Sequence, residues 1–160
     1  MMRAEPRLYI FDADGTLRWT TVDGQKYPLR TSEWRLMPNV ADRLSAIPWS
    51  PDGPWLAIAS NQNGVAEGLL DEATARALMA DMLVAALGRV PERTIVELCM
   101  CREQSECDCR KPAPGLLLRL LDAHRLAPHE AVFVGDLQID AEAARRAGIP
   151  FVWAHDFFRR

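Results

Sequence analysis

Short apolar runs alternate with longer helical patterns along the chain, and this alternation restricts the possible folds more than any other feature. The runs that we interpret as strands cover residues 7–11, 55–60, 94–100, 131–135 and 151–153. Between them, Asp71 and Pro114 are suited to start helices and Gly88 to end one. Such an alternation is typical of a parallel sheet covered by helices on both faces. We therefore predict an α/β, Rossmann-like three-layer fold with a mainly parallel sheet.

The composition is that of an ordinary soluble domain. The 160 residues suit one globular domain, so we predict a single domain over residues 1–160. The hydrophobic share of 49% is enough for a core, and the net charge of −3 argues against nonspecific nucleic-acid binding as the main function. The longest uncharged stretch, residues 53–66, is too short and too polar to cross a bilayer. No signal peptide is visible before Asp12, so we expect a cytoplasmic protein without a membrane partner.

Polar residues stand at the points where three of the predicted strands end. Asp12 and Asp14 follow the first strand, and Ser60 ends the second. Asp136 follows the fourth strand, and Lys111 precedes a predicted helix on the same side of the sheet. In open parallel sheets, ligands bind at the carboxyl ends of the strands. We therefore expect three carboxylates, a hydroxyl and an ammonium group to meet at one rim.

Carboxylates gathered at one rim repel one another unless a cation lies between them. Mg²⁺ takes oxygen ligands and usually keeps waters for substrate phosphate. Asp12 and Asp136 are the best candidate ligands, with Asp140 one helical turn further along, and Lys111 and Ser60 are natural partners for phosphate oxygens. Because no serine or cysteine nucleophile motif is marked out, a carboxylate nucleophile that gives an acyl phosphate is the available alternative.

Four segments resemble, in order, the motifs of the haloacid dehalogenase superfamily of phosphohydrolases. Residues 12–16, Asp-Ala-Asp-Gly-Thr, resemble its DxDGT signature. Ser60, Lys111 and residues 136–140 occupy the three other motif positions. The resemblance covers nearly the whole chain and implies a magnesium-dependent phosphatase.

The resemblance also implies a two-step mechanism. Asp12 attacks the phosphorus atom and becomes an aspartyl phosphate, while Asp14 protonates the leaving oxygen and then activates the water that cleaves the intermediate. Ser60 and Lys111 fix the phosphoryl group, and the metal neutralises its developing charge. The magnesium ligands that the resemblance implies are Asp12, Asp14 through its backbone carbonyl, Asp136 and Asp140.

All four cysteines fall in one short segment with the spacing C-x-C-x₅-C-x-C. They are Cys99, Cys101, Cys107 and Cys109. Four thiolates so close in sequence can surround one tetrahedral Zn²⁺, and a closed four-thiolate shell would staple the loop 99–109 rather than take part in chemistry. Free thiols in a surface loop are the alternative. Disulfides are less expected because cytoplasmic thiols stay reduced.

The residues around the second cysteine pair narrow the resemblance. Residues 107–112, CDCRKP, resemble the zinc-loop subgroup of the superfamily, which contains heptose bisphosphate phosphatase and histidinol-phosphate phosphatase. Cys101 stands where this subgroup typically has His, and either residue can ligate zinc. The loop would bring Arg110 and Lys111 directly to the end of the sheet where phosphate is expected to bind. A zinc ion that fixes the loop would therefore hold these two residues in place.

A chain of this length leaves no room for a separate cap domain, so loops are expected to choose the substrate. Residues 60–66 resemble the T-N-Q-x-G-I-A segment of the heptose and histidinol group, with Glu67 in place of its usual Arg. Asn61 in this loop and Arg110 in the zinc loop are candidate substrate-binding residues.

Residues 17–37 are polar, rich in Arg and Trp and without a clear period, so we interpret them as a long loop or flap. Residues 24–28 and 32–35 resemble the flap of polynucleotide 3′-phosphatases. The candidates for stacking on or clamping the substrate are Trp19, Trp34 and Arg35, with pinning of the flap to the body as the alternative for Trp34. Four basic side chains suit a second phosphate or a nucleic-acid end, or else form a solvated loop face. They are Arg18, Lys26, Arg30 and Arg35.

These patterns favour Mg²⁺-dependent hydrolysis of a small phosphorylated metabolite, such as heptose bisphosphate or histidinol phosphate. A polynucleotide 3′-phosphatase acting on a nucleic-acid 3′ end is the alternative substrate class. A phosphorylation-receiver domain is the non-enzyme alternative, although it lacks the second Asp of the DxD motif. The net acidity argues against a zinc-organised nucleic-acid adaptor, and the oligomeric state is left open.

Overall fold

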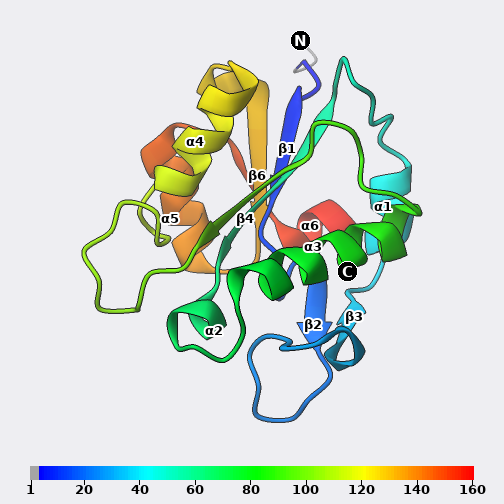
Figure 1. Cartoon of the computed structure of the whole chain (residues 1–160). Coiled ribbons are helices and arrows are strands. Elements are labelled where there is room, and N and C mark those ends of the chain that lie inside the picture. Colours follow the sequence, from blue (N-terminus) through cyan, green and yellow to red (C-terminus); the bar gives the residue numbers. More distant parts are fainter. Residues whose placement is uncertain (1–3) are drawn as a thin grey trace.

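Five parallel strands form the central sheet of the computed structural model, which describes residues 4–160 (Figure 1). The strands are β1 Leu8–Phe11, β4 Trp55–Asn61, β5 Ile95–Cys99, β6 Ala131–Gly135 and β7 Phe151–Trp153. Their order across the sheet is β5-β4-β1-β6-β7, and every neighbouring pair is parallel. The predicted α/β fold with a parallel sheet is therefore confirmed, and each predicted strand lies within two residues of its observed bounds.

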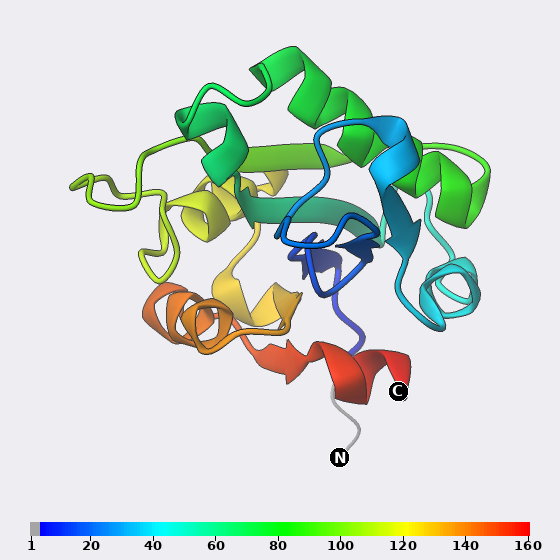
Figure 2. The same ribbon diagram turned by 90° about the horizontal axis from the view of Figure 1, so that it is seen from below.

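Helices cover both faces of the sheet because its central strands are apolar on both sides. One layer contains α1 Val40–Ser45, α3 Glu72–Leu87 and α6 Ala154–Phe158, and the other contains α4 Gly115–His124 and α5 Gln138–Ala147. Tyr9 and Phe11 of β1 pack into the first layer, whereas Leu8 and Ile10 pack into the second. This period of two is what a strand buried on both faces requires. Figure 2 shows α4 and α5 on one side of the sheet and α1 and α6 on the other.

Local signals set several helix ends. The Asp71 side chain accepts a hydrogen bond of 2.7 Å from the backbone N–H of Thr74, which caps α3, and Gly88 ends that helix with a φ of 77°. Gly148 ends α5 in the same left-handed conformation. The four-residue helix α2, Asn63–Ala66, lies in the loop after β4.

The segment 17–37 is more ordered than its sequence predicts. Its ends form two short antiparallel strands, β2 Arg18–Thr20 and β3 Trp34–Leu36. The residues between these strands are irregular, apart from one 3₁₀ turn at Thr31–Glu33. The prediction of a continuous loop was wrong at these ends, because three-residue strands are too short to show a period. We call residues 18–36 the ribbon; within residues 4–160, the ribbon and α1 are the elements between β1 and β4.

The C-terminal residues pack against the sheet. Phe157 and Phe158 of α6 are buried, and the ring of Phe157 lies 5.5 Å from that of Phe11 in an edge-to-face arrangement. Among the described residues, no helix combines the length and the apolar character needed to span a membrane.

Two adjacent leucines of α4 provide a test of this packing. Leu117 is completely buried between α4 and the sheet, whereas Leu118 is 43% exposed. We expect Leu117→Ala to lower the free energy of unfolding by about 2–5 kcal/mol, because it leaves a cavity in the core. Leu118→Ala should cost less than about 1 kcal/mol. Urea unfolding of both variants measures the difference; equal losses would contradict the assignment of the buried face.

Candidate active site

The carboxyl ends of β4, β1 and β6 lie side by side and open into one cavity of about 570 Å³. This end of the sheet faces the ribbon and α2 (Figure 1). The cavity brings together eight of the side chains that the sequence singled out. They are Asp12, Asp14, Ser60, Asn61, Arg110, Lys111, Asp136 and Asp140.

A buried lysine organises the floor of this cavity. The Nζ atom of Lys111 donates hydrogen bonds of 2.7 Å to Asp12, 2.7 Å to Asp140 and 3.0 Å to the backbone oxygen of Ala59. Burial alone would lower the pKa of Lys111, but the two carboxylates outweigh it, so the pKa is raised and the ammonium stays charged. The side chain of Lys111 is therefore fixed between a strand end and a helix start.

The carboxylates carry more negative charge than this lysine can balance. Burial raises the pKa of Asp12 well above its ordinary value; Lys111 opposes this effect, and the charges of Asp140 and Asp136 add to it. The pKa of Asp136 is raised as well, again mainly by burial. A divalent cation at this position would stabilise the ionised forms of these groups.

The donor set fits a hard metal ion. Asp12, Asp136 and Asp140 each offer one oxygen atom, and these atoms lie within 4.8 Å of one another. Within residues 4–160, the second oxygen of Asp12 receives only a long hydrogen bond, 3.5 Å, from Thr16. Asp140 is more engaged, because it also accepts hydrogen bonds from the backbone N–H groups of Asp136 and Leu137. Asp12 and Asp136 therefore have the most capacity left to bind Mg²⁺.

Two glycines allow these carboxylates to approach the backbone. Gly15 has a φ of 86°, and a Cβ atom there would clash with the carboxylate of Asp136. A Cβ atom on Gly135 would lie 2.6 Å from the Cβ of Asp140. The glycine of the DxDGT signature is thus required both by its left-handed conformation and by the Asp136 carboxylate beside it.

Asp14 lies apart from the other carboxylates and has different partners. Its Oδ1 atom accepts a hydrogen bond of 2.8 Å from Nε of Arg18. Its Oδ2 atom lies 3.4 Å from the amide nitrogen of Gln62, which also donates a 2.8 Å hydrogen bond to Ser60. Arg18 and Gln62 are site residues that the sequence reasoning missed: Arg18 was interpreted as part of a basic flap surface, and it is buried.

The expected substrate-binding residues divide into two groups. Asn61 exchanges hydrogen bonds with the backbone of Lys111, and Arg110 donates to the side chain of Asn63, so both are held at the cavity. Trp34 packs against the core and Arg35 is exposed; neither lines the cavity. This packing of Trp34 agrees with the alternative role of pinning the ribbon to the body.

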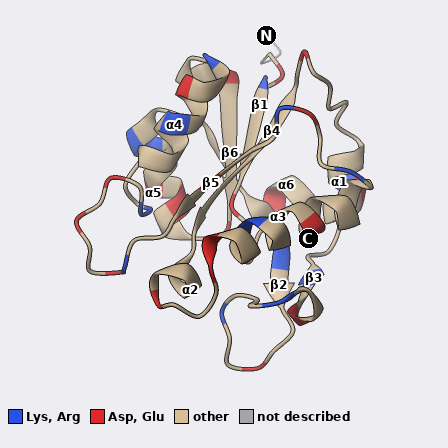
Figure 3. Ribbon diagram, viewed as in Figure 1, with Lys and Arg blue, Asp and Glu red and all other residues tan. Residues whose placement is uncertain are grey.

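Other side chains of the ribbon lie at the rim, and the sequence singled out two of them, Trp19 and Lys26. Trp19, Lys26 and Tyr27 line the cavity, and Trp19 is 50% exposed. The ribbon carries basic and acidic residues together (Figure 3), with Arg30 paired to Glu33 at 3.3 Å. Its surface is therefore less basic than the count of arginines and lysines suggests.

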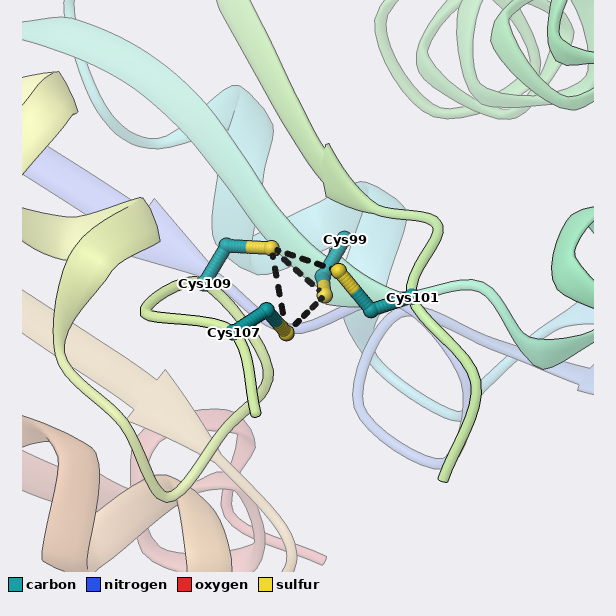
Figure 4. A group of neighbouring side chains, drawn as sticks. All are labelled: Cys99, Cys101, Cys107 and Cys109. Atoms are coloured by element: carbon teal, nitrogen blue, oxygen red, sulfur yellow. Dashed lines mark hydrogen bonds between the residues drawn. The ribbon is translucent and has the colours of Figure 1, made fainter. Parts of the chain in front are cut away.

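The four cysteines form a tight cluster at the end of β5 (Figure 4). All are free thiols. Three of the sulfur–sulfur distances are 3.6, 3.7 and 3.8 Å, and the distance between Cys99 and Cys109 is 2.7 Å. A tetrahedral zinc ion with Zn–S bonds of about 2.3 Å places its ligands about 3.8 Å apart. The cluster is therefore suited to one structural zinc ion.

The cysteine loop is joined directly to Lys111, the lysine on the floor of the cavity. The backbone oxygen of Asp108 accepts a 2.7 Å hydrogen bond from Gly115, the first residue of α4, and a Cβ atom on Gly115 would clash with this backbone. Lys111 lies between Asp108 and Gly115 in the sequence, so the conformation of the cysteine loop determines the position of the Lys111 backbone.

Comparisons with known proteins agree with this geometry. A family model described as haloacid dehalogenase-like hydrolase matches residues 86–154. The chain is 31% identical over 142 residues to D-glycero-beta-D-manno-heptose-1,7-bisphosphate 7-phosphatase of Pseudomonas putida, covering 89% of this chain and 78% of that protein. The corresponding protein of Pseudomonas aeruginosa is 32% identical over 138 residues, covering 86% and 75%.

The chain belongs to the haloacid dehalogenase-like hydrolase family. Within it, the chain is a phosphatase that resembles heptose-1,7-bisphosphate 7-phosphatase. The crystal structure of D,D-heptose 1,7-bisphosphate phosphatase from B. bronchiseptica, complexed with magnesium and phosphate, superposes with a TM-score of 0.75 at 28% identity. That superposition covers 90% of this chain and 78% of the other. The family resemblance predicted from the four motifs is confirmed.

Zinc binding can be tested with a matched pair of variants in the cysteine loop. We expect the purified protein to retain one zinc ion per chain through dialysis, and Cys107→Ser to lose it, because a closed tetrahedral site needs all four thiolates. Ser105→Ala, in the same loop but outside the cluster, should keep the metal. Metal analysis of the dialysed proteins gives the answer; zinc retained equally by both variants would contradict the site.

Proposed function

We propose that this phosphatase hydrolyses the phosphomonoester of a small sugar phosphate or bisphosphate, with Mg²⁺ and through an aspartyl phosphate on Asp12. The observation that carries the proposal is the buried ammonium of Lys111, held between Asp12 and Asp140 at the carboxyl ends of the central strands. The relatives that act on heptose 1,7-bisphosphate, and one solved relative with bound magnesium and phosphate, support it.

The proposed magnesium ligands are the carboxylates of Asp12 and Asp136 and the backbone carbonyl of Asp14, with Asp140 completing the acidic group. The ion would supply charge neutralisation for the phosphoryl oxygens when it is bound. Lys111 contributes the second positive charge, and the hydroxyl of Ser60 donates a hydrogen bond to the phosphoryl group.

Asp12 and Asp14 have different tasks in the two steps of the proposed reaction. The Oδ atom of Asp12 forms a bond to phosphorus as the bond to the leaving oxygen breaks, and Asp14 gives that oxygen its proton. Asp14 then takes a proton from the water that attacks the aspartyl phosphate, which releases inorganic phosphate and restores the carboxylate of Asp12. Lys111 stays charged throughout and balances the negative charge that the phosphoryl group brings.

We propose that one domain, residues 1–160, carries this activity, with the flap 17–37 and the zinc loop 99–109 around an uncapped site. A zinc ion held by the four cysteines would keep Arg110 and Lys111 in place. The exposed ring of Trp19 offers a flat surface for a sugar ring, next to the polar groups of Asn61 and Arg110. These features favour a compact, hydroxyl-rich substrate over a polynucleotide 3′ end.

Removal of the proposed nucleophile is the most direct test of the mechanism. Asp12→Asn should lower the rate of phosphate release by more than about 10⁴-fold, because the amide cannot form the phosphoenzyme. Asp122→Asn, an exposed change on α4, should leave the rate unchanged. Phosphate release with Mg²⁺ present is measured for both; turnover retained in Asp12→Asn would refute the mechanism.

The substrate class is tested by comparing compounds on the same protein. Heptose bisphosphate and other sugar phosphates should be hydrolysed with higher kcat/KM than histidinol phosphate or a 3′-phosphorylated oligonucleotide. Trp19→Ala should raise KM for the best sugar phosphate about 3- to 10-fold through loss of ring stacking. Ser32→Ala, an exposed change elsewhere in the ribbon that does not line the cavity, should leave KM unchanged. Preference for the oligonucleotide would overturn the substrate assignment while leaving the phosphatase mechanism intact.

A further inference from the structure

Arg18 is a buried arginine whose side chain is paired with Asp14. We infer that Arg18 is a positioning residue: it orients the Asp14 carboxyl for proton transfer to the leaving oxygen. The inference rests on the proposed function, in which Asp14 moves that proton. It assigns a role to a side chain that lies outside the four motifs.

The contact between the two side chains is a fork. Nε of Arg18 donates a hydrogen bond of 2.8 Å to Oδ1 of Asp14, and a terminal nitrogen of Arg18 lies 3.4 Å from Oδ2. One rigid guanidinium group thereby contacts both carboxylate oxygens. This arrangement fixes the plane of the carboxylate as well as its distance.

The burial of Arg18 makes Asp14 its principal electrostatic partner. Arg18 is 1% exposed and is the largest fully buried side chain of the described residues. Its remaining nitrogen, Nη1, has no hydrogen-bond partner within residues 4–160, and its one salt bridge there is to Asp14. A buried guanidinium needs a counter-ion. The position of Asp14 is therefore coupled to that of Arg18.

The backbone makes this pair rigid. The N–H of Gly15 donates a 2.7 Å hydrogen bond to the oxygen of Arg18, and the N–H of Arg18 donates to the oxygen of Ala13 at 3.1 Å. The N–H of Met37 donates to Leu17, which ties this turn to the far end of the ribbon. Asp14 and Arg18 thus stand on a closed turn with little freedom to drift apart.

A second buried side chain limits Asp14 from another direction. The amide nitrogen of Gln62 lies 3.4 Å from Oδ2 of Asp14 and 2.8 Å from the hydroxyl of Ser60. Gln62 therefore links the proton-transfer carboxyl to the hydroxyl that faces the phosphoryl group. With Arg18 on one side and Gln62 on the other, the carboxyl of Asp14 has a defined direction relative to the hydroxyl of Ser60.

Proton transfer affects substrates unequally, and this difference separates positioning from general damage. An alkyl leaving group departs as a strongly basic alkoxide unless it receives a proton, whereas 4-nitrophenolate departs readily without one. The parameter kcat/KM covers the steps up to departure of the leaving group, so it reports the transfer from Asp14 and excludes the later attack by water. A misdirected Asp14 must therefore slow alkyl phosphates selectively.

The experiment measures kcat/KM for an alkyl phosphate, glycerol 2-phosphate, and for 4-nitrophenyl phosphate with Mg²⁺ in excess. Arg18→Gln should lower the value for the alkyl phosphate about 10- to 100-fold and that for the aryl phosphate less than about 3-fold, as expected for partial loss of a general acid. Arg18→Lys, which keeps the charge but not the fork, should lie between wild type and Arg18→Gln. The matched control Arg43→Gln removes another arginine, one that donates to the backbone of Phe157, and should change neither value.

A double-mutant cycle tests the dependence on Asp14. In an Asp14→Asn background, Arg18→Gln should cause no further loss with the alkyl phosphate, because the group that it positions is already disabled. Losses that multiply, or that are equal for the two substrates, would overturn the inference. If urea titration shows that Arg18→Gln is not folded, Arg18→Lys replaces it in both tests. These are the comparison of alkyl with aryl phosphate and the double-mutant cycle with Asp14→Asn, and the same outcomes then support or overturn the inference.

The same variants separate this inference from the proposed function. Full activity of Asp14→Asn on the alkyl phosphate would refute the proton-transfer role of Asp14 itself, and with it both proposals. Strong loss in Asp14→Asn with normal activity in both Arg18 variants would refute only the positioning role. Selective loss in all three supports the inference.

Discussion

The ammonium group of Lys111, buried between two carboxylates, is the interaction on which the rest of the site depends. Asp12 follows the central strand β1, Asp140 lies in the first turn of α5, and Lys111 follows the cysteine loop, so three segments far apart in sequence meet at one nitrogen atom. A buried ion pair is strongly destabilised when one partner is removed or displaced. Strand, helix and loop are therefore fixed relative to one another by the same contacts that prepare the phosphoryl site.

The one ammonium group of Lys111 is not enough to balance the carboxylates on the floor of this cavity. Burial raises the pKa of both Asp12 and Asp136, which disfavours having all the carboxylates ionised at once. A divalent cation such as Mg²⁺, if held by these carboxylates, would relieve that repulsion. The metal and the lysine would thus have separate tasks in the proposed reaction: the lysine fixes the geometry of the acidic group, and the metal would balance its charge when a dianionic phosphate enters.

The strand ends and their polar residues were predictable from the sequence because they follow from local rules. Apolar runs define the strands, and parallel strands must bring Asp12, Ser60 and Asp136 to one edge. The partners of Asp14 could not be predicted in this way. Arg18 lies in a strand of three residues, which carries no periodic signal, and its burial depends on the pairing of β2 with a strand sixteen residues away in sequence. Its spacing of four residues from Asp14 was the only available hint.

The ribbon connects the choice of substrate with the chemistry. Successive residues of a strand point to opposite sides, so Arg18 is buried beside Asp14 while its neighbour Trp19 is half exposed at the rim of the cavity. In the proposed reaction, a leaving group resting on Trp19 would therefore contact the same strand whose Arg18 is bonded to Asp14. Because Trp19 and Arg18 share one short backbone segment, we expect a substrate that fits poorly at the rim to be misplaced relative to Asp14. Under this proposal, specificity would appear in the rate of proton transfer as well as in binding.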